Sequence, residues 1–167
     1  MRIATILFAV LLPFAARAND TARAEIKNAS GKVLGTLVFS QTEGGVRVTG
    51  ALKDLPSGLH GIHIHETGQC SAPDFKSAGE HFNPTGKQHG DKNPQGPHAG
   101  DLGNITVTTD GKASVNALAK GATIGPGSAS LVRNGGAAVV IHAKADDLSS
   151  DPAGNSGDRI ACGEIRK

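Results

Sequence analysis

The chain has 167 residues, of which 38% are hydrophobic and 3% aromatic, and it carries 17 basic and 15 acidic side chains. This length suits one domain with a real hydrophobic core. The charge is nearly balanced and there is no tract of interleaved basic and aromatic residues, which argues against a nucleic-acid partner.

The first 18 residues have the layout of a secretory signal peptide. Arg2 precedes an apolar run over residues 3–14, and residues 16–18 (Ala-Arg-Ala) form an A-x-A-like cleavage site. The run is too short to cross a bilayer, although a retained anchor is the alternative interpretation. We therefore expect a signal peptide over residues 1–18 and one exported domain over residues 19–167, with no membrane association once the leader is removed.

The remaining sequence predicts an all-β domain. No stretch keeps a helical period, and short alternating runs are instead separated by turn sequences such as NASGK, QTEGG and TTDGK. The predicted strands cover residues 22–27, 33–40, 45–51, 58–65, 102–108, 112–117, 137–142 and 160–165. Eight short strands are typical of a sandwich or a closed barrel.

Two long connections do not fit the strand pattern, residues 66–101 and residues 143–159. Both are rich in Gly, Pro, Asn, Ser and Asp. A connection of about 35 residues without secondary structure is uncommon in a compact domain and usually has a functional reason. Because the first loop contains three of the seven histidines, we expect a metal ion to organise it.

The fourth predicted strand, GLHGIHIH, places two histidines on one face. Side chains alternate along a strand, so His63 and His65 share one face while Ile62 and Ile64 share the other. The isoleucines can pack in the core while the two imidazoles bind one metal ion. An isolated pair of this kind is more often only solvated or hydrogen-bonded. His60 points the other way on an ideal strand, and we expect a structural role for it.

Three more histidines lie in the first loop and another ends a predicted strand. The loop contributes His81, His89 and His98, with Asp101 at its end, and His142 ends the apolar run AAVVI. Each of these residues taken singly is more often a surface or turn residue. Their number in one exported chain favours metal binding.

The ligand types divide these residues into two sets. The strands offer His63, His65 and His142, and a set of imidazoles suits copper or zinc. The first loop offers His89, His98 and Asp101, which with His81 give three nitrogens and one oxygen, a set that fits tetrahedral zinc. His81 could serve both sites, because a deprotonated imidazole can bind a metal at each nitrogen, but spacing alone leaves this open.

Cys70 and Cys162 are the only cysteines in the sequence. Two cysteines in an exported chain most simply form one disulfide, and two buried thiols are the alternative. The closed loop of roughly 90 residues would contribute about 4 to 5 kcal/mol in the chain-entropy description.

These segments together resemble the copper/zinc superoxide dismutases, in the form that bacteria export. In the family's order the matching segments are GLHGIHIHETGQC, GEHFNPTGKQHG, GPHAGDLGN, VVIHAKADDL and GDRIACGEI. The resemblance implies an eight-stranded antiparallel Greek-key sandwich or barrel with two long functional loops. It also implies dismutation of superoxide to O₂ and hydrogen peroxide by a copper that cycles by one electron beside a structural zinc.

The resemblance implies a role for each site residue. The copper ligands are His63, His65, His81 and His142, and the zinc ligands are His81, His89, His98 and Asp101.

The bridging histidine, His81, and Arg159 are the implied catalytic residues. His81 would carry a proton, and Arg159 would attract and position the superoxide anion. Asp146 would hydrogen-bond one ligand from each metal site. A disulfide between Cys70 and Cys162 would tie the metal loop to the last strand and so help to hold the arginine.

The second loop departs from the family pattern. It looks shorter than in animal and plant members, and it lacks the lysine and paired glutamates that attract superoxide there. Lys76, Lys87 and Lys92 of the first loop are expected to take their place. Asn104 lies in a match to the glycosylation pattern, interpreted as chance because a glycan against the metal loop is implausible.

Two other functions are compatible with parts of the sequence and are less favoured. A non-catalytic, exported copper/zinc-binding domain of the metallochaperone kind would commonly lose copper ligands or the arginine, and this chain keeps them. A zinc hydrolase would need an open zinc position and a general base.

We expect the periplasm as the location, with the extracellular space as the alternative. A homodimer is one arrangement to consider, but the resemblance does not fix the oligomeric state, because dimer contacts differ between the bacterial and eukaryotic branches.

Overall fold

The computed structural model describes residues 20–167, so the predicted signal peptide lies outside the described residues. The strands are β1 (Thr21–Asn28), β2 (Val33–Thr42), β3 (Gly45–Leu52), β4 (Gly58–His65), β5 (Asp101–Val107), β6 (Ala113–Lys120), β7 (Ala138–His142) and β8 (Arg159–Glu164). No helix in the described part of the chain is long and apolar enough to cross a membrane.

All eight predicted strands are present in the structure. The largest difference in their bounds is at β6, which continues past Ala117 to Lys120 because it pairs with β3 over its whole length. The one element that the sequence did not predict is η1 (Lys76–Ala78), a single 3-10 turn within the first loop.

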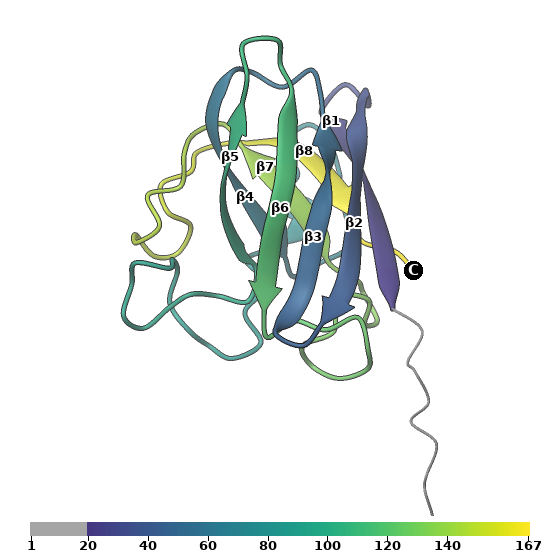
Figure 1. The fold of residues 1–167 in the computed structure, drawn as a ribbon, viewed down its shortest axis with the longest axis vertical. Coiled ribbons are helices and arrows are strands. Elements are labelled where there is room, and N and C mark those ends of the chain that lie inside the picture. Colours follow the sequence, from purple (N-terminus) through teal and green to yellow (C-terminus); the bar gives the residue numbers. More distant parts are fainter. Residues whose placement is uncertain (1–19) are drawn as a thin grey trace, which may run out of the picture.

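The strands form one antiparallel sheet that curls into a nearly closed barrel (Figure 1). Their order is β5-β4-β7-β8-β1-β2-β3-β6, so β5 and β6 are the two ends of the sheet and lie next to each other. The neighbours β4–β7, β8–β1 and β3–β6 are not consecutive in the chain, which gives the Greek-key crossovers. The predicted fold class is therefore confirmed.

Alternating side chains fill the barrel interior. In β1, for example, Ala22, Ala24 and Ile26 are buried while their neighbours are exposed. A second, smaller cluster lies apart from this core, between the first loop and the other face of β7 and β8. Its members are Phe75, Ala78, Ala138, Val140 and Cys162, with Cys70 packed against them.

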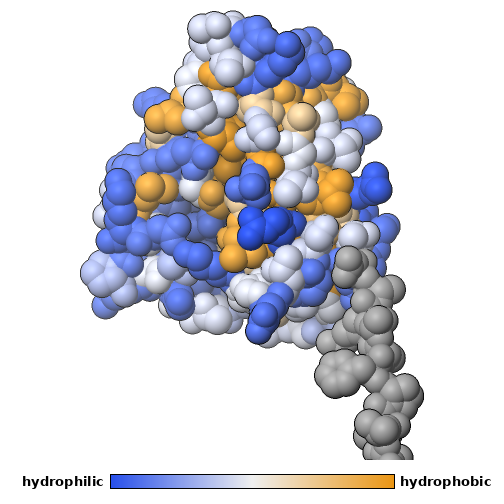
Figure 2. Space-filling model, in the orientation of Figure 1, coloured by the Kyte–Doolittle hydropathy of each residue, from blue (hydrophilic) through white to orange (hydrophobic). Residues whose placement is uncertain are grey.

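The two long loops pack against each other on one side of the barrel (Figure 1). Several hydrogen bonds join them; among these, Lys92 N–H donates to Leu148 O at 2.9 Å, and His89 N–H donates to the Asp151 carboxylate at 2.6 Å. Their outer surface is mainly hydrophilic, on the left of Figure 2. The loops therefore form one polar body attached to an apolar scaffold.

Candidate metal centre

Four imidazoles meet at the side of the barrel, where β4 and β7 lie beside the first loop. This four-imidazole group consists of His63, His65, His81 and His142. Each offers one nitrogen, and these nitrogens lie within 4.8 Å of one another. The predicted alternation in β4 is present, because Ile62 and Ile64 are fully buried in the main core.

The nitrogens of this group have an unusual property. In the described residues, the buried side-chain nitrogen and oxygen atoms without a hydrogen-bond partner are His63 Nδ1, His65 Nε2, His81 Nε2 and His142 Nε2. An unpartnered buried polar atom costs free energy, and such atoms are rare in folded proteins. Four of them at one point could hold a metal ion, and imidazole donors suit copper.

The other ring nitrogens of these histidines are held by the protein. His65 Nδ1–H donates to Gly79 O at 2.9 Å, and His142 Nδ1–H donates to Gly157 O at 3.1 Å. His63 Nε2 lies 2.7 Å from Asp146 Oδ2. Such contacts fix the tautomer and orientation of a ligating ring, so each free nitrogen is presented in one direction.

A second group adjoins the first and is named here the Asp101 group. It consists of His81, His89, His98 and Asp101, all of them buried. The Nδ1 atoms of His81, His89 and His98 lie 2.9, 3.0 and 3.3 Å from Asp101 Oδ1. Three nitrogens and one carboxylate oxygen fit tetrahedral zinc.

His81 belongs to both groups. Its Nδ1 atom faces Asp101 Oδ1, whereas its Nε2 atom is among the unpartnered nitrogens of the four-imidazole group. One ring therefore presents a nitrogen to each group. Sequence spacing left this arrangement open. In the structure, an isolated antiparallel β-bridge pairs His81 with His65 and so places its ring beside the four-imidazole group.

The pKa shifts differ among these buried histidines. Burial lowers the pKa of His65 to about 2, of His142 to about 3 and of His81 to about 4. These rings are therefore neutral, the form that binds a metal. Burial also lowers the pKa of His89, but its hydrogen bonds with Asp101 and Asp146 outweigh burial and raise it to about 9.

Asp146 connects the two groups. Its Oδ2 atom lies 2.7 Å from His63 Nε2, and its Oδ1 atom lies 3.0 Å from His89 Nε2. Burial raises the pKa of this carboxyl, but the hydrogen bonds of both histidines bring it well below its ordinary value. A single carboxylate therefore orients one ring of each group.

Two residues that hold Asp146 were not identified from the sequence. Asn104 donates from Nδ2 to Asp146 O at 2.8 Å and accepts from Asp146 N–H at 2.7 Å. Gly154 has φ +62°, and a Cβ there would collide with Asp146 Oδ1 and His89 Nε2. The sequence offered only a glycosylation pattern at Asn104 and one glycine among many.

His60 is not part of either group. Its Nδ1 and Nε2 atoms lie 2.8 and 2.9 Å from the backbone oxygens of His142 and Pro56, which leaves neither nitrogen free for a metal. The expected structural role agrees with these contacts.

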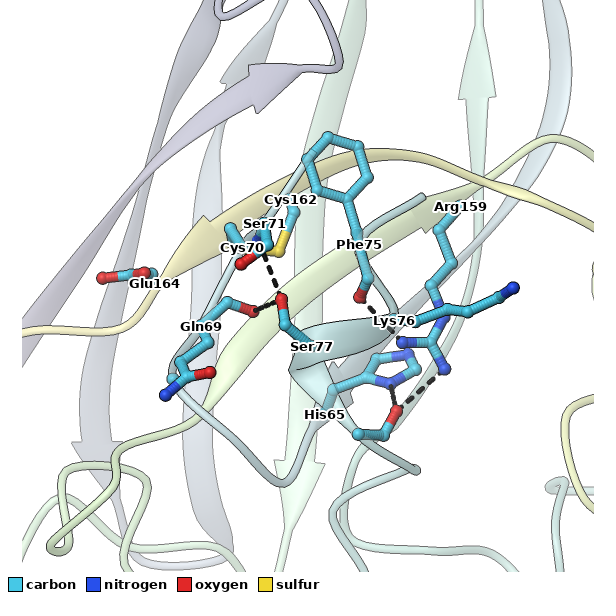
Figure 3. Close-up of a disulfide and its surroundings, with 12 residues drawn as sticks. His65, Gln69, Cys70, Ser71, Phe75, Lys76, Ser77, Arg159, Cys162 and Glu164 are labelled. Carbon is cyan, nitrogen blue, oxygen red and sulfur yellow. Dashed lines mark hydrogen bonds between the residues drawn. A yellow bond between two sulfur atoms is a disulfide. The ribbon is translucent and has the colours of Figure 1, made fainter. Parts of the chain in front are cut away.

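Arg159 lies at the start of β8, close to the four-imidazole group. Its Nη1 donates to Phe75 O at 2.9 Å and its Nη2 donates to Gly79 O at 2.8 Å (Figure 3). Burial lowers its pKa from the ordinary value, but an arginine keeps its charge. After burial, the charge of Arg159 is among the causes that lower the pKa of His65 and His142.

A small surface pocket of about 450 Å³ opens beside this guanidinium. It is lined by Pro73, Asp74, Lys76, Gly157, Asp158 and Arg159. Of the three lysines expected to attract an anion, Lys76 lines this pocket and the other two do not. The pocket thus brings two basic and two acidic side chains together at Arg159.

The predicted disulfide between Cys70 and Cys162 is present, with a Cα–Cα distance of 5.7 Å. It joins the start of the first loop to β8, the strand that begins with Arg159. The loop that supplies His81 is therefore covalently attached to the strand that supplies the arginine.

Comparisons with known proteins agree with this geometry. The family profile for copper/zinc superoxide dismutase matches residues 33–165. Superoxide dismutase Cu-Zn 2 of Aquifex aeolicus is 48% identical over 147 residues, covering 87% of this chain and 86% of the relative. Superoxide dismutase Cu-Zn 1 of the same organism is 44% identical over 162 residues, covering 96% of each.

Solved structures show the same similarity. A superoxide dismutase-like protein from Bacillus subtilis has a TM-score of 0.81 at 39% identity, covering 85% of this chain and 96% of that chain. The Cu/Zn superoxide dismutase from Brucella abortus has a TM-score of 0.69 at 27% identity, covering 88% of this chain and 100% of that chain.

Proposed function

Because the chain belongs to the copper/zinc superoxide dismutase family, we propose that the four-imidazole group binds copper and the Asp101 group binds zinc. The protein is a superoxide dismutase that converts superoxide to O₂ and hydrogen peroxide, with copper and zinc as cofactors. The observation that supports this division is the set of four unpartnered imidazole nitrogens within reach of one another.

The residues around the metals have separate tasks in this proposal. When bound, copper supplies the one-electron redox chemistry that zinc cannot supply. Arg159 attracts the superoxide anion through its charge and orients it with donors whose directions are fixed. His81 Nε2, which has no protein partner, holds a proton for the product whenever that nitrogen is free of metal.

Asp146 keeps the two groups in a fixed relation during turnover. It contacts His63 on one side and His89 on the other, while Asn104 holds its backbone. A carboxylate behind a metal-binding histidine fixes the ring and raises its basicity.

The non-catalytic metal-binding alternative is not favoured. Both metal groups are complete, and the half-buried Arg159 lies beside the four-imidazole group with a pocket at its side. A domain that only carried copper would have no use for an anion-attracting arginine at that point.

Residues 1–18 are proposed to be a signal peptide that is removed on export, leaving one domain over residues 19–167. Support comes from the disulfide, which forms and persists in oxidising compartments. The periplasm is the proposed location. The homodimeric arrangement stays a prediction.

Metal analysis combined with a superoxide assay tests the proposed function. We expect about one copper and one zinc ion per purified chain, one for each group. Chelation of copper should abolish activity, and copper alone should restore it, because zinc has no redox chemistry. A protein loaded with copper that shows no activity would overturn the proposal.

Arg159→Ala is expected to lower the second-order rate by about tenfold or more while copper content is retained, because charge steering contributes about 10- to 1,000-fold to association rates. Arg159→Lys should recover part of the loss, since it keeps the charge but not the planar pair of donors. Pulse radiolysis at several ionic strengths measures both rates.

The matched control is Arg47→Ala, which removes the same charge from an exposed position on β3. It should leave the rate within about twofold of the parent, because β3 adjoins none of the strands β4, β7 and β8 in the sheet, and exposed charges are screened over a Debye length of about 8 Å. Equal rates for Arg159→Ala and Arg47→Ala would contradict the role given to Arg159.

A further inference from the structure

The guanidinium of Arg159 is held by two backbone carbonyls at the two ends of η1. Phe75, just before η1, supplies one oxygen at 2.9 Å, and Gly79, just after it, supplies the other at 2.8 Å. Both belong to the first loop, whereas Arg159 belongs to β8. The direction of the guanidinium therefore depends on how firmly this part of the loop is placed.

Phe75 is the large apolar side chain of that part of the loop. It is 2% exposed and packs with Val140, Ala138 and Cys162, in the cluster that is separate from the barrel core. Figure 3 shows its ring on the disulfide side of the loop and its carbonyl oxygen turned toward Arg159. Ring and carbonyl leave the same residue in different directions and reach different partners.

The backbone at Phe75 is in the left-handed region, with φ 54° and ψ 20°. This conformation is uncommon for a bulky residue without glycine's freedom, and it persists only where the surroundings impose it. Here three contacts impose it: the buried ring, the bond from Phe75 N–H to Ser71 O at 3.0 Å, and the bond that Phe75 O accepts from Ala78 N–H at 3.1 Å. In the left-handed turn the carbonyl can accept from Arg159 while the ring stays buried.

From these contacts we infer that Phe75 is a positioning residue, whose buried ring fixes the carbonyl that orients the guanidinium of Arg159. The inference rests on the proposed role of Arg159 for its effect on the rate. The disulfide attaches the same loop five residues earlier, at Cys70, and so cannot by itself fix the direction of the Phe75 carbonyl.

The test is a series of substitutions with two measurements. Phe75→Ala should lower the second-order rate by about tenfold, since a misplacement of about 1 Å can cost up to about a hundredfold. Phe75→Leu, which refills most of the pocket, should recover most of that rate and remains informative if the alanine variant fails to fold. Copper content and the copper electron paramagnetic resonance spectrum should be unchanged, because no metal ligand is altered.

The second measurement does not depend on activity. Phenylglyoxal modifies accessible guanidinium groups, and peptide mass spectrometry reports the extent at each arginine. Modification of Arg159 should be several-fold faster in Phe75→Ala than in the parent, with Phe75→Leu in between. Arg47 in the same sample is the internal reference, because it is exposed in every variant.

Phe39→Leu is the matched control for Phe75→Leu, because Phe39 is equally buried but lies in the main barrel core. It should lower stability and leave both the rate and the reactivity of Arg159 unchanged. Unchanged reactivity of Arg159 in both Phe75 variants would overturn the inference. Faster modification without a loss of rate would uphold the positioning by Phe75 and contradict the proposed role of Arg159.

Discussion

His63→Ala is expected to abolish copper binding at the four-imidazole group and to remove the dismutase activity. The ring supplies one of the four converging nitrogens, so its removal leaves three. Loss of a contact behind a metal ligand already costs about 10- to 100-fold, so loss of the ligand should cost more than about a hundredfold. Metal analysis and a superoxide assay measure the two losses.

The fold and the zinc site should survive this substitution. Asp146 keeps its contact with His89 at 3.0 Å, so the carboxylate is not left alone when the His63 ring is removed. Zinc should remain at about one ion per chain. His60→Gln is the control on the same strand, because His60 is buried outside both metal groups, and it should retain copper and activity. Full copper content in His63→Ala would contradict the assignment.

Removal of the disulfide is expected to have the largest effect on stability. In the metal-free protein, Cys70→Ala/Cys162→Ala should lower the free energy of unfolding by about 4 to 5 kcal/mol, because the bond closes a loop of about 90 residues in the unfolded chain. Urea unfolding measures the change. The metal-free form is used because bound metals also stabilise the folded state and would hide part of the loss.

A reducing agent provides the matched comparison. The parent protein, once reduced, should unfold at about the same urea concentration as the double variant, and the variant itself should not respond to the reductant. A loss below about 1 kcal/mol would mean that the unfolded chain is already restricted without the bond, as compact denatured states can be.

The scaffold and the metal donors could be predicted from the sequence because each depends on a local rule. Alternation in β4 separates His63 and His65 from Ile62 and Ile64 without knowledge of any other strand. Turn sequences mark the strand ends almost to the residue. The resemblance to a known family then assigned metal donors that lie far apart in the chain to common sites.

The residues that hold the site in place could not be predicted in the same way. Asn104 hydrogen-bonds to the backbone of Asp146, 42 positions away. The Phe75 carbonyl accepts a hydrogen bond from Arg159, 84 positions away. Both act through contacts with backbone atoms, which every residue possesses, so neither leaves a characteristic spacing. The positive φ at Phe75 is also invisible in the sequence, because a bulky residue is rarely expected there.

One oxygen atom in the first loop has a consequence for how the site behaves when the loop moves. Gly79 O accepts a hydrogen bond from the His65 ring at 2.9 Å and another from Arg159 at 2.8 Å. The imidazole and the guanidinium are thus both oriented by the same backbone oxygen. Because the two side chains share this acceptor, a displacement of Gly79 would alter both hydrogen bonds at once.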